Sequence, residues 1–238
     1  MRFKTIHSLG SRCQNSEVLK HFGYREFSGF FDFMNTSKVA AINHILEDDF
    51  KEILSDSNNV SLVCNQMTIE PETGEMLPTS IRTSNKYYNK DYNNIDEAIF
   101  PHHDLNTEKD KKHFIKCKER FKKLVNHNTL FNYTYNKWEN DITEDDMEKM
   151  VEILKNIHGF KNFKICFIGV NVSSYSSFKL VTKSEYYDVW SLTINNSFTG
   201  GLFNNDNDNQ NYIRIIKNYD IDDNRLTKEE IDTEHNNL

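Results

Sequence analysis

The sequence predicts an α/β fold, with a single domain whose mostly parallel central sheet is flanked by helices, as in a Rossmann-like three-layer sandwich. Segments with strand-like and helix-like apolar spacing alternate along the chain, and this alternation is typical of parallel sheets. One of them, 163–172 (FKICFIGVNV), is a continuous apolar run, which indicates a central strand buried on both faces. The length of 238 residues suits one domain of this kind.

The N-terminal segment has the pattern of a strand, a tight turn and a helix. Residues 3–9 are rich in β-forming side chains, and Gly10 ends them. Residues 12–22 have apolar side chains at helical spacing, and Gly23 stands where a helix stop is expected. The aromatic segment 27–34 (FSGFFDFM) is expected to be buried.

One helix and a long irregular stretch follow. Thr36 or Ser37 is expected to cap a helix whose apolar residues share one face, namely Val39, Ile42, Ile45 and Leu46. Residues 55–100 are a candidate loop-rich insertion, in which 60–69 favours one strand and 71–78 favours a turn.

The second half alternates more regularly. Its expected elements are a helix over 108–125, a strand over 129–135, a helix over 143–158, strands over 163–172 and 187–194, and a helix over 210–216. Residues 204–209 (NNDNDN) resemble a calcium loop in composition but lack its Gly and distal Glu, so we expect a polar loop there. The single domain is therefore expected over 1–220, with 221–238 as a charged, frayed tail.

Composition narrows the classes of function. The formal net charge of −7 disfavours a general nucleic-acid-binding protein, and the lysine-rich run 109–123 is interpreted as a solvated helix face. No apolar stretch approaches the ~20 residues that span a bilayer, and the N-terminus lacks a secretory apolar run, so we expect a cytoplasmic protein without a membrane span. No pattern indicates a cofactor or a metal, and the scattered cysteines disfavour disulfides; they are Cys13, Cys64, Cys117 and Cys166.

Cys13 is the candidate nucleophile. It belongs to the segment Gly10-Ser11-Arg12-Cys13-Gln14, where the expected first strand turns into the first helix. In parallel sheets such turns lie at the carboxyl edge, where functional sites gather. The N–H groups of a first helical turn, together with Arg12, would stabilise a thiolate, and Gly10 would permit a sharp turn. The alternative is a small buried cysteine, which position alone supports about equally.

The candidate base lies in His102-His103-Asp104, since a thiol nucleophile needs one. Adjacent histidines point in different directions, so only one of them would face the site. Asp104 could orient its ring, and so could Asp32, a carboxylate in the aromatic segment. The alternatives are a solvated loop in which Asp104 caps a helix, and an Asp32 that accepts backbone N–H groups.

These residues carry a resemblance to a known family. The pattern consists of Ser8-Leu9-Gly10, Cys13, Phe27-Ser28-Gly29, Asp32-Phe33-Met34 and His103-Asp104. It resembles a family labelled "putative papain-like cysteine peptidase", which occurs in bacteria and large DNA viruses. Phe33 stands where that family has a tryptophan. The resemblance extends over most of the chain but is specific only in 6–34 and at His103-Asp104.

The resemblance implies Cys13 as nucleophile, His103 as base and Asp104 or Asp32 as the group that orients the ring. The expected α/β pattern differs from papain itself, whose cysteine opens a long helix in another architecture.

Three functions then compete. The first is a thiol hydrolase for a peptide, isopeptide or ester bond, in which the turn around Cys13 binds substrate or oxyanion through Gly10, Ser11, Arg12 and Gln14, with His102 nearby. The second is an acyltransferase or another transferase of surface-glycan assembly, which a large pocket with basic residues near its mouth would favour. The third is a binding module in which Cys13 is simply buried. The sequence identifies neither the peptide, acyl or glycan substrate nor the oligomeric state.

Overall fold

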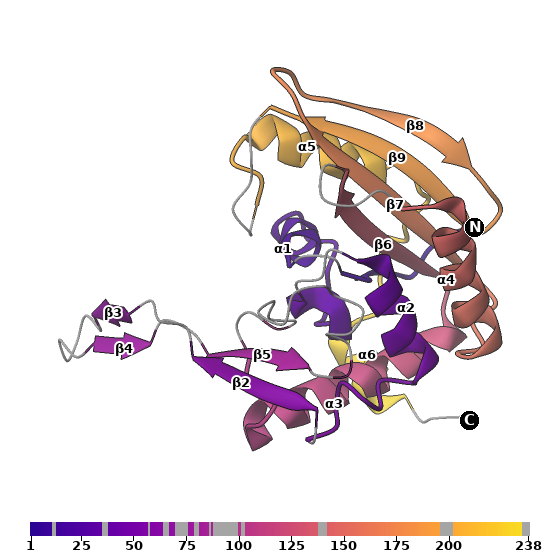
Figure 1. The fold of residues 1–238 in the computed structure, drawn as a ribbon. Coiled ribbons are helices and arrows are strands. Elements are labelled where there is room, and N and C mark those ends of the chain that lie inside the picture. Colours follow the sequence, from indigo (N-terminus) through magenta and orange to yellow (C-terminus); the bar gives the residue numbers. More distant parts are fainter. Residues whose placement is uncertain are drawn as a thin grey trace.

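The computed structural model describes residues 1–10, 13–34, 38–56, 58–63, 67–69, 76–78, 81–85, 87, 100, 103–137, 142–195 and 202–234. Its centre is a five-stranded sheet in the order β1-β6-β7-β9-β8 (Figure 1). The first four strands in this order are parallel, and β8 joins the edge antiparallel to β9. The strands are β1 (Thr5–Ser8), β6 (Thr129–Asn136), β7 (Phe163–Val172), β8 (Ser177–Lys183) and β9 (Tyr187–Ile194).

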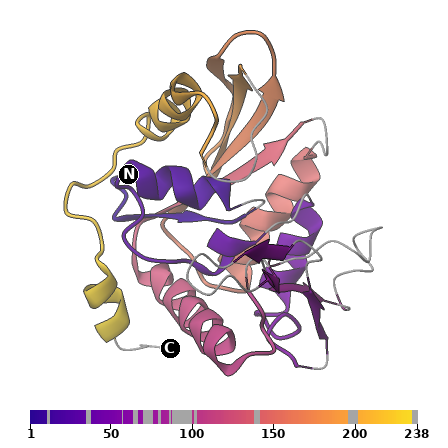
Figure 2. The ribbon, with the colours of Figure 1, turned by 90° about the vertical axis from the view of Figure 1, so that its left-hand side faces the viewer.

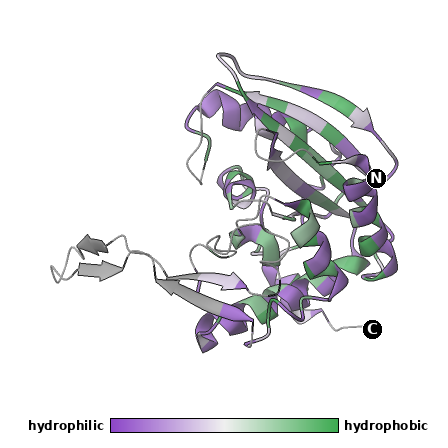
Figure 3. Ribbon diagram, in the orientation of Figure 1, coloured by the Kyte–Doolittle hydropathy of each residue, from purple (hydrophilic) through white to green (hydrophobic). Residues whose placement is uncertain are grey.

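Helices cover both faces of this sheet. Two of them, α1 (Gln14–His21) and α5 (Asp206–Ile216), share a hydrophobic core with one face, which includes Leu130 and Ile168. The opposite face packs against α2 (Val39–Glu47), α3 (Glu108–Lys123) and α4 (Glu144–Asn156). Hydrophobic residues accordingly gather in the sheet and on the helix faces around it (Figure 3). The expected three-layer α/β fold is confirmed.

Strand β7 is the central strand, as its apolar run predicts. It pairs with β6 on one side and β9 on the other. Its successive side chains enter opposite cores, with Phe167 on the α3 and α4 side and Ile168 on the α1 and α5 side. This two-faced burial explains why the run lacks polar alternation.

The region 55–100 contributes two short antiparallel ladders. Strands β2 (Asn59–Val63) and β5 (Ile81–Asn85) pair with each other, and β3 (Met67–Ile69) pairs with β4 (Met76–Pro78). Both ladders extend away from the three-layer body (Figure 1). The single strand expected over 60–69 is wrong, because β2 and β3 belong to different ladders.

Two further expectations fail near the C-terminus. The polar residues 206–209 form the first turn of α5, and the Asn205 side chain caps it by accepting the N–H of Asn207 at 2.9 Å, so no loop forms there. The segment after residue 220 is not frayed over its described part. It forms α6 (Lys228–Thr233), which packs beside α3 (Figure 2) and is held by a two-pronged contact between Arg120 and Asp232.

Among the described residues, no helix is both long and apolar enough to cross a membrane.

Candidate active site

Cys13 directly precedes α1 at the carboxyl edge of the sheet. Strand β1 ends at Ser8, and Gly10 then adopts a left-handed φ of 96°, which a residue with a Cβ rarely adopts. The Cys13 carbonyl accepts the N–H of Glu17 at 3.0 Å, so the residue begins the helical hydrogen-bonding pattern. The thiol therefore sits at the positive end of the helix. Ser11 and Arg12 lie outside the described residues.

The three cysteines that the structure describes differ in accessibility. Cys13 is partly exposed, whereas Cys117 and Cys166 are buried. Burial raises the pKa of Cys117 to about 12, and burial likewise raises the pKa of Cys166 to about 12. Both buried thiols therefore stay protonated at neutral pH, and Cys13 is the accessible one of the three.

Buried amides support the turn around Cys13. Asn15 donates from Nδ2 to the carbonyl of Gly10 at 2.5 Å and accepts from the Tyr212 hydroxyl at 3.2 Å, which ties the turn to α5. The amide of Gln14 is 2% exposed, and its Nε2 has no hydrogen-bond acceptor among the described residues. Gln14, which follows Cys13 in the chain, thus carries a buried side-chain donor without an acceptor among the described residues.

Contacts through the aromatic segment connect α1 with His103. Ser16 Oγ lies 3.1 Å from the carbonyl oxygens of both Cys13 and Asp32. Asp32 belongs to the short 3-10 helix η1 (Phe30–Phe33), and the Phe33 ring meets the His103 ring edge-on at 4.8 Å. Ser16 and His103 therefore contact neighbouring residues of η1, Asp32 and Phe33.

The carboxylate beside His103 is Asp110. His103 Nδ1 lies 3.3 Å from Asp110 Oδ1, and Asp110 Oδ2 accepts the N–H of Asp104 at 2.8 Å. Asp104 Oδ1 instead accepts the N–H of Asn106 at 3.0 Å, in the turn that enters α3. Asp110 lies in the first turn of α3 and was not among the residues predicted for the site. The seven-residue separation from His103 gives no periodic signal, because the turn at 104–107 brings the two together. His102 lies outside the described residues.

Asp32 accepts a backbone N–H group, as one of its two interpretations expects. Its Oδ2 accepts the N–H of Gly29 at 2.8 Å and is bonded by Arg25 Nη1 at 3.2 Å. Burial raises the Asp32 pKa to about 6, against the opposing charge of Arg25. The side chain fixes the 29–32 turn and anchors Arg25.

His7 is a buried titratable group that sequence reasoning missed. It points from β1 toward Phe27, with ring centroids 4.8 Å apart. Its Nδ1 and Asp32 Oδ1 lie 3.1 Å and 3.5 Å from the place that a Cβ of residue 29 would occupy, so Gly29 is needed for the close approach. Burial, followed by Arg25 and Arg120, lowers the His7 pKa to about 3, so the imidazole is neutral.

A second thiol and imidazole meet on α3. Cys117 Sγ lies 3.6 Å from His113 Nε2, and the His113 ring stacks on that of His103 with an interplanar angle of 11°. Because Cys117 is wholly buried and its pKa is raised, this pair serves packing and not nucleophilic attack.

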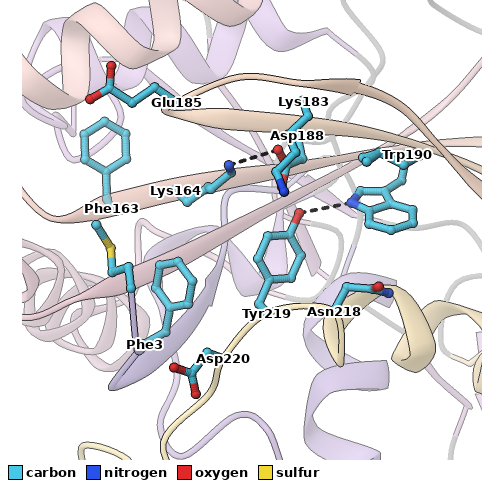
Figure 4. Close-up of a pocket in the computed structure, with 12 residues that line it drawn as sticks. Phe3, Phe163, Lys164, Lys183, Glu185, Asp188, Trp190, Asn218, Tyr219 and Asp220 are labelled. Carbon is cyan, nitrogen blue, oxygen red and sulfur yellow. Dashed lines mark hydrogen bonds and ion pairs between the residues drawn. The ribbon is translucent and has the colours of Figure 1, made fainter.

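A hollow of about 440 Å³ opens at the amino edge of the sheet, opposite Cys13 (Figure 4). Four of its lining side chains form two pairs. Lys164 Nζ lies 2.9 Å from Asp188 Oδ1, and Trp190 Nε1 donates to the Tyr219 hydroxyl at 3.0 Å. Other polar side chains also line it, namely Lys183, Glu185, Asn218 and Asp220.

A second hollow, of about 480 Å³, lies where the end of α1, the 25–28 segment, α3 and α6 meet. We call it the basic hollow, because its lining includes His113 and five cationic side chains, which are Lys20, Arg25, Lys116, Arg120 and Lys228.

Comparison with known proteins adds one finding. A family model described as "putative papain-like cysteine peptidase" matches residues 4–140. The match contains β1, Cys13, η1, His103, Asp110 and β6. No curated protein and no solved structure gives a significant match. Within the described residues, no three His, Cys, Asp or Glu side chains converge as metal ligands would. Because this family model covers more than half of the 238 residues, the chain belongs to the family described as "putative papain-like cysteine peptidase".

Proposed function

We propose that this protein is a thiol hydrolase that cleaves a peptide, isopeptide or ester bond with Cys13 as nucleophile. One observation carries the proposal: Cys13 is the accessible cysteine of the three described, and it begins a helix at the carboxyl edge of a parallel sheet. Membership in the peptidase family supports the same chemistry.

The proposed reaction begins when His103 takes the proton of the Cys13 thiol, and the N-terminus of α1 stabilises the resulting thiolate. The sulfur attacks the substrate carbonyl, and a C–S bond forms as the carbonyl π electrons move onto oxygen. The Gln14 side-chain amide and backbone N–H groups of the turn would hold this oxyanion; losing one such donor typically costs about 10²–10³ in rate. The leaving group departs with a proton from His103, and water then cleaves the thioester with His103 as base.

Asp110 takes the role of orienting the base in this proposal. Its Oδ1 lies beside His103 Nδ1, which would leave Nε2 for proton transfer. Asp104 and Asp32 are the weaker candidates, because Asp104 bonds Asn106 and Asp32 bonds Gly29 and Arg25.

The test is thiol labelling followed by mass spectrometry of peptides, combined with hydrolysis of a fluorogenic ester and a peptide library. Cys13 should react with iodoacetamide much faster than Cys117 in the native protein, and Cys13→Ala should abolish hydrolysis. Cys117→Ala is the matched control and should keep activity. His103→Gln should abolish turnover, and Asp110→Asn should lower kcat more than it changes KM. Equal labelling of Cys13 and Cys117, or full activity of Cys13→Ala, would refute the proposal and favour a non-catalytic binding module.

A transferase is the second candidate: the basic hollow has a cationic lining that would suit the carrier of an acyl donor, and it lies at the end of α1 away from Cys13. In that case Cys13 would take an acyl group from a thioester donor and pass it to an acceptor such as a glycan hydroxyl. The two candidates differ in one measurement: a transferase forms acylated acceptor in excess over free acid, whereas a hydrolase releases free acid whether or not an acceptor is present.

A further inference from the structure

We propose that the basic hollow is a binding site for a phosphate group. The site requires no chemistry at Cys13, so it stands or falls separately from the proposed hydrolase. The lysine-rich run was expected to be a solvated helix face, and Lys116 is exposed as expected, whereas Arg120 is 6% exposed; both side chains line this hollow.

The cationic side chains around the hollow outnumber the carboxylates that could neutralise their charge. Asp232 Oδ2 lies 3.0 Å from Arg120 Nη2, 3.2 Å from Lys116 Nζ and 3.0 Å from Lys228 Nζ. One carboxylate carries a single negative charge, so it cannot balance all three. These contacts hold the pKa of Asp232 well below its usual range, which shows how strongly positive the surroundings are.

Arg25 contributes hydrogen-bond donors that are already in position. Its side chain is 10% exposed and is fixed by Nη1, which bonds Ser16 Oγ at 2.9 Å and Asp32 Oδ2 at 3.2 Å. Its Nε and Nη2 have no acceptor among the described residues, although Arg25 lines the hollow. A guanidinium held by one nitrogen, with its other edge free, is suited to two-pronged binding of an oxyanion.

The remaining groups leave an excess of positive charge. Six cationic side chains, the five of the lining and Arg225, meet four carboxylates. Glu26 is drawn to Arg225 at 2.8 Å, and Lys20 has only Glu17, at 3.9 Å. The excess of two positive charges stands on a chain whose net charge is −7, so it is a local feature that attracts anions.

Phosphate fits this excess better than a carboxylate does. A phosphate monoester carries between one and two negative charges at neutral pH and has three acceptor oxygens, so it can engage the Arg25 fork and several lysines at once. A carboxylate has one charge and two oxygens. The same phosphate chemistry could come from free phosphate or from a phosphorylated small molecule.

The experiment is isothermal titration calorimetry at constant ionic strength, with inorganic phosphate, glucose 6-phosphate and glucose as probes. The test variant is Lys20→Gln/Lys116→Gln/Lys228→Gln. The matched control is Lys51→Gln/Lys161→Gln/Lys179→Gln, which loses the same charge at exposed positions outside the hollow. We expect one phosphate per chain to bind wild type and the control alike, with binding at least about tenfold weaker in the test variant. Glucose should not bind.

The two phosphate probes distinguish the source. Tighter binding of glucose 6-phosphate than of phosphate supports a phosphorylated small molecule, and equal binding supports free phosphate. Absence of binding at millimolar phosphate would overturn the proposal, as would equal affinities of the two triple variants.

A second measurement on wild type needs no variant to fold. Reductive methylation followed by mass spectrometry should show Lys20, Lys116 and Lys228 protected by phosphate while Lys179 reacts unchanged. Uniform reactivity of these lysines with and without phosphate would likewise overturn the proposal.

Discussion

The buried pair His7 and Asp32 should make the stability of this protein depend on pH in two opposite ways that nearly cancel. Both side chains are enclosed beside Gly29, and burial shifts their pKa values in opposite directions, to about 3 for His7 and about 6 for Asp32. The pH-dependent contribution of each residue to stability can be measured separately when the other residue is replaced.

The His7 contribution is lost in acid. Its folded pKa of about 3 lies below the ordinary value of 6.5, so the unfolded chain takes up the proton first as the pH falls. The contribution of His7 to stability is complete above the unfolded pKa of 6.5 and decreases as the pH falls toward the folded pKa of about 3. By about pH 4 the loss is about 3 kcal/mol, at about 1.4 kcal/mol per pH unit.

The Asp32 contribution has the opposite sign. Its folded pKa of about 6 lies above the ordinary value of 3.8, so over the interval between them the folded protein holds a proton that the unfolded chain has released. The contribution of Asp32 to stability is therefore complete below the unfolded pKa of 3.8. It is lost as the pH rises through the folded pKa of about 6, by about 3 kcal/mol in total.

The assay is urea unfolding at several pH values between about 4 and 7, followed by the fluorescence of buried Trp190. Relative to wild type, His7→Gln should gain about 3 kcal/mol on acidification across this range, because only the Asp32 contribution remains. Asp32→Asn should lose about the same amount, because only the His7 contribution remains. Parallel pH profiles for the three proteins would refute the reasoning. They would mean that neither side chain changes its protonation between the folded and the unfolded protein over this pH range.

Other substitutions test the packing. Gly169→Ala on β7 would place a Cβ 2.8 Å from the Tyr135 hydroxyl, so we expect a loss of about 1–3 kcal/mol in urea unfolding, whereas an unchanged midpoint would contradict the close contact. Thr143→Ala removes a capping box with Asp146 and should cost about 1 kcal/mol, with Thr143→Ser as the neutral control. Asp232→Asn should destabilise the protein by about 1–3 kcal/mol and should shift its acid unfolding to higher pH, since the lowered Asp232 pKa is then lost; an unchanged acid limb would argue against the cluster.

The layered fold could be predicted from the sequence because a central strand buried on both faces gives a continuous apolar run. The run 163–172 coincides with β7, and α4 lies within the helix expected over 143–158. Strand β8 gave no such signal, because it is an edge strand whose Leu180 and Val181 stay exposed and no burial pattern constrains its residues. The helical start of α5 was hidden for a related reason: Asp and Asn favour turns and caps, and only the fold decides which.

The strand-to-helix turn of the candidate site could be predicted from the sequence, but the residues that contact His103 and His7 could not. Cys13 and Gly10 are close in sequence, so local pattern is enough to place them. The neighbour of His103 depends on a turn that returns Asp110 to the ring, and the position of His7 depends on the packing of β1 against η1. Both contacts are tertiary, and neither leaves a periodic trace in the sequence.

The pairing of β1 has a consequence for how this protein must be made. Thr5 pairs with Thr129 on β6, and the β6 edge opposite β1 is covered only by β7, which begins at Phe163. The family match ends at residue 140, so it includes β6 without its second neighbour. Most of the chain must therefore be synthesised before β1, which leads into the Cys13 turn, can pair within the sheet. We accordingly expect a fragment ending at residue 140 to aggregate and not to fold alone.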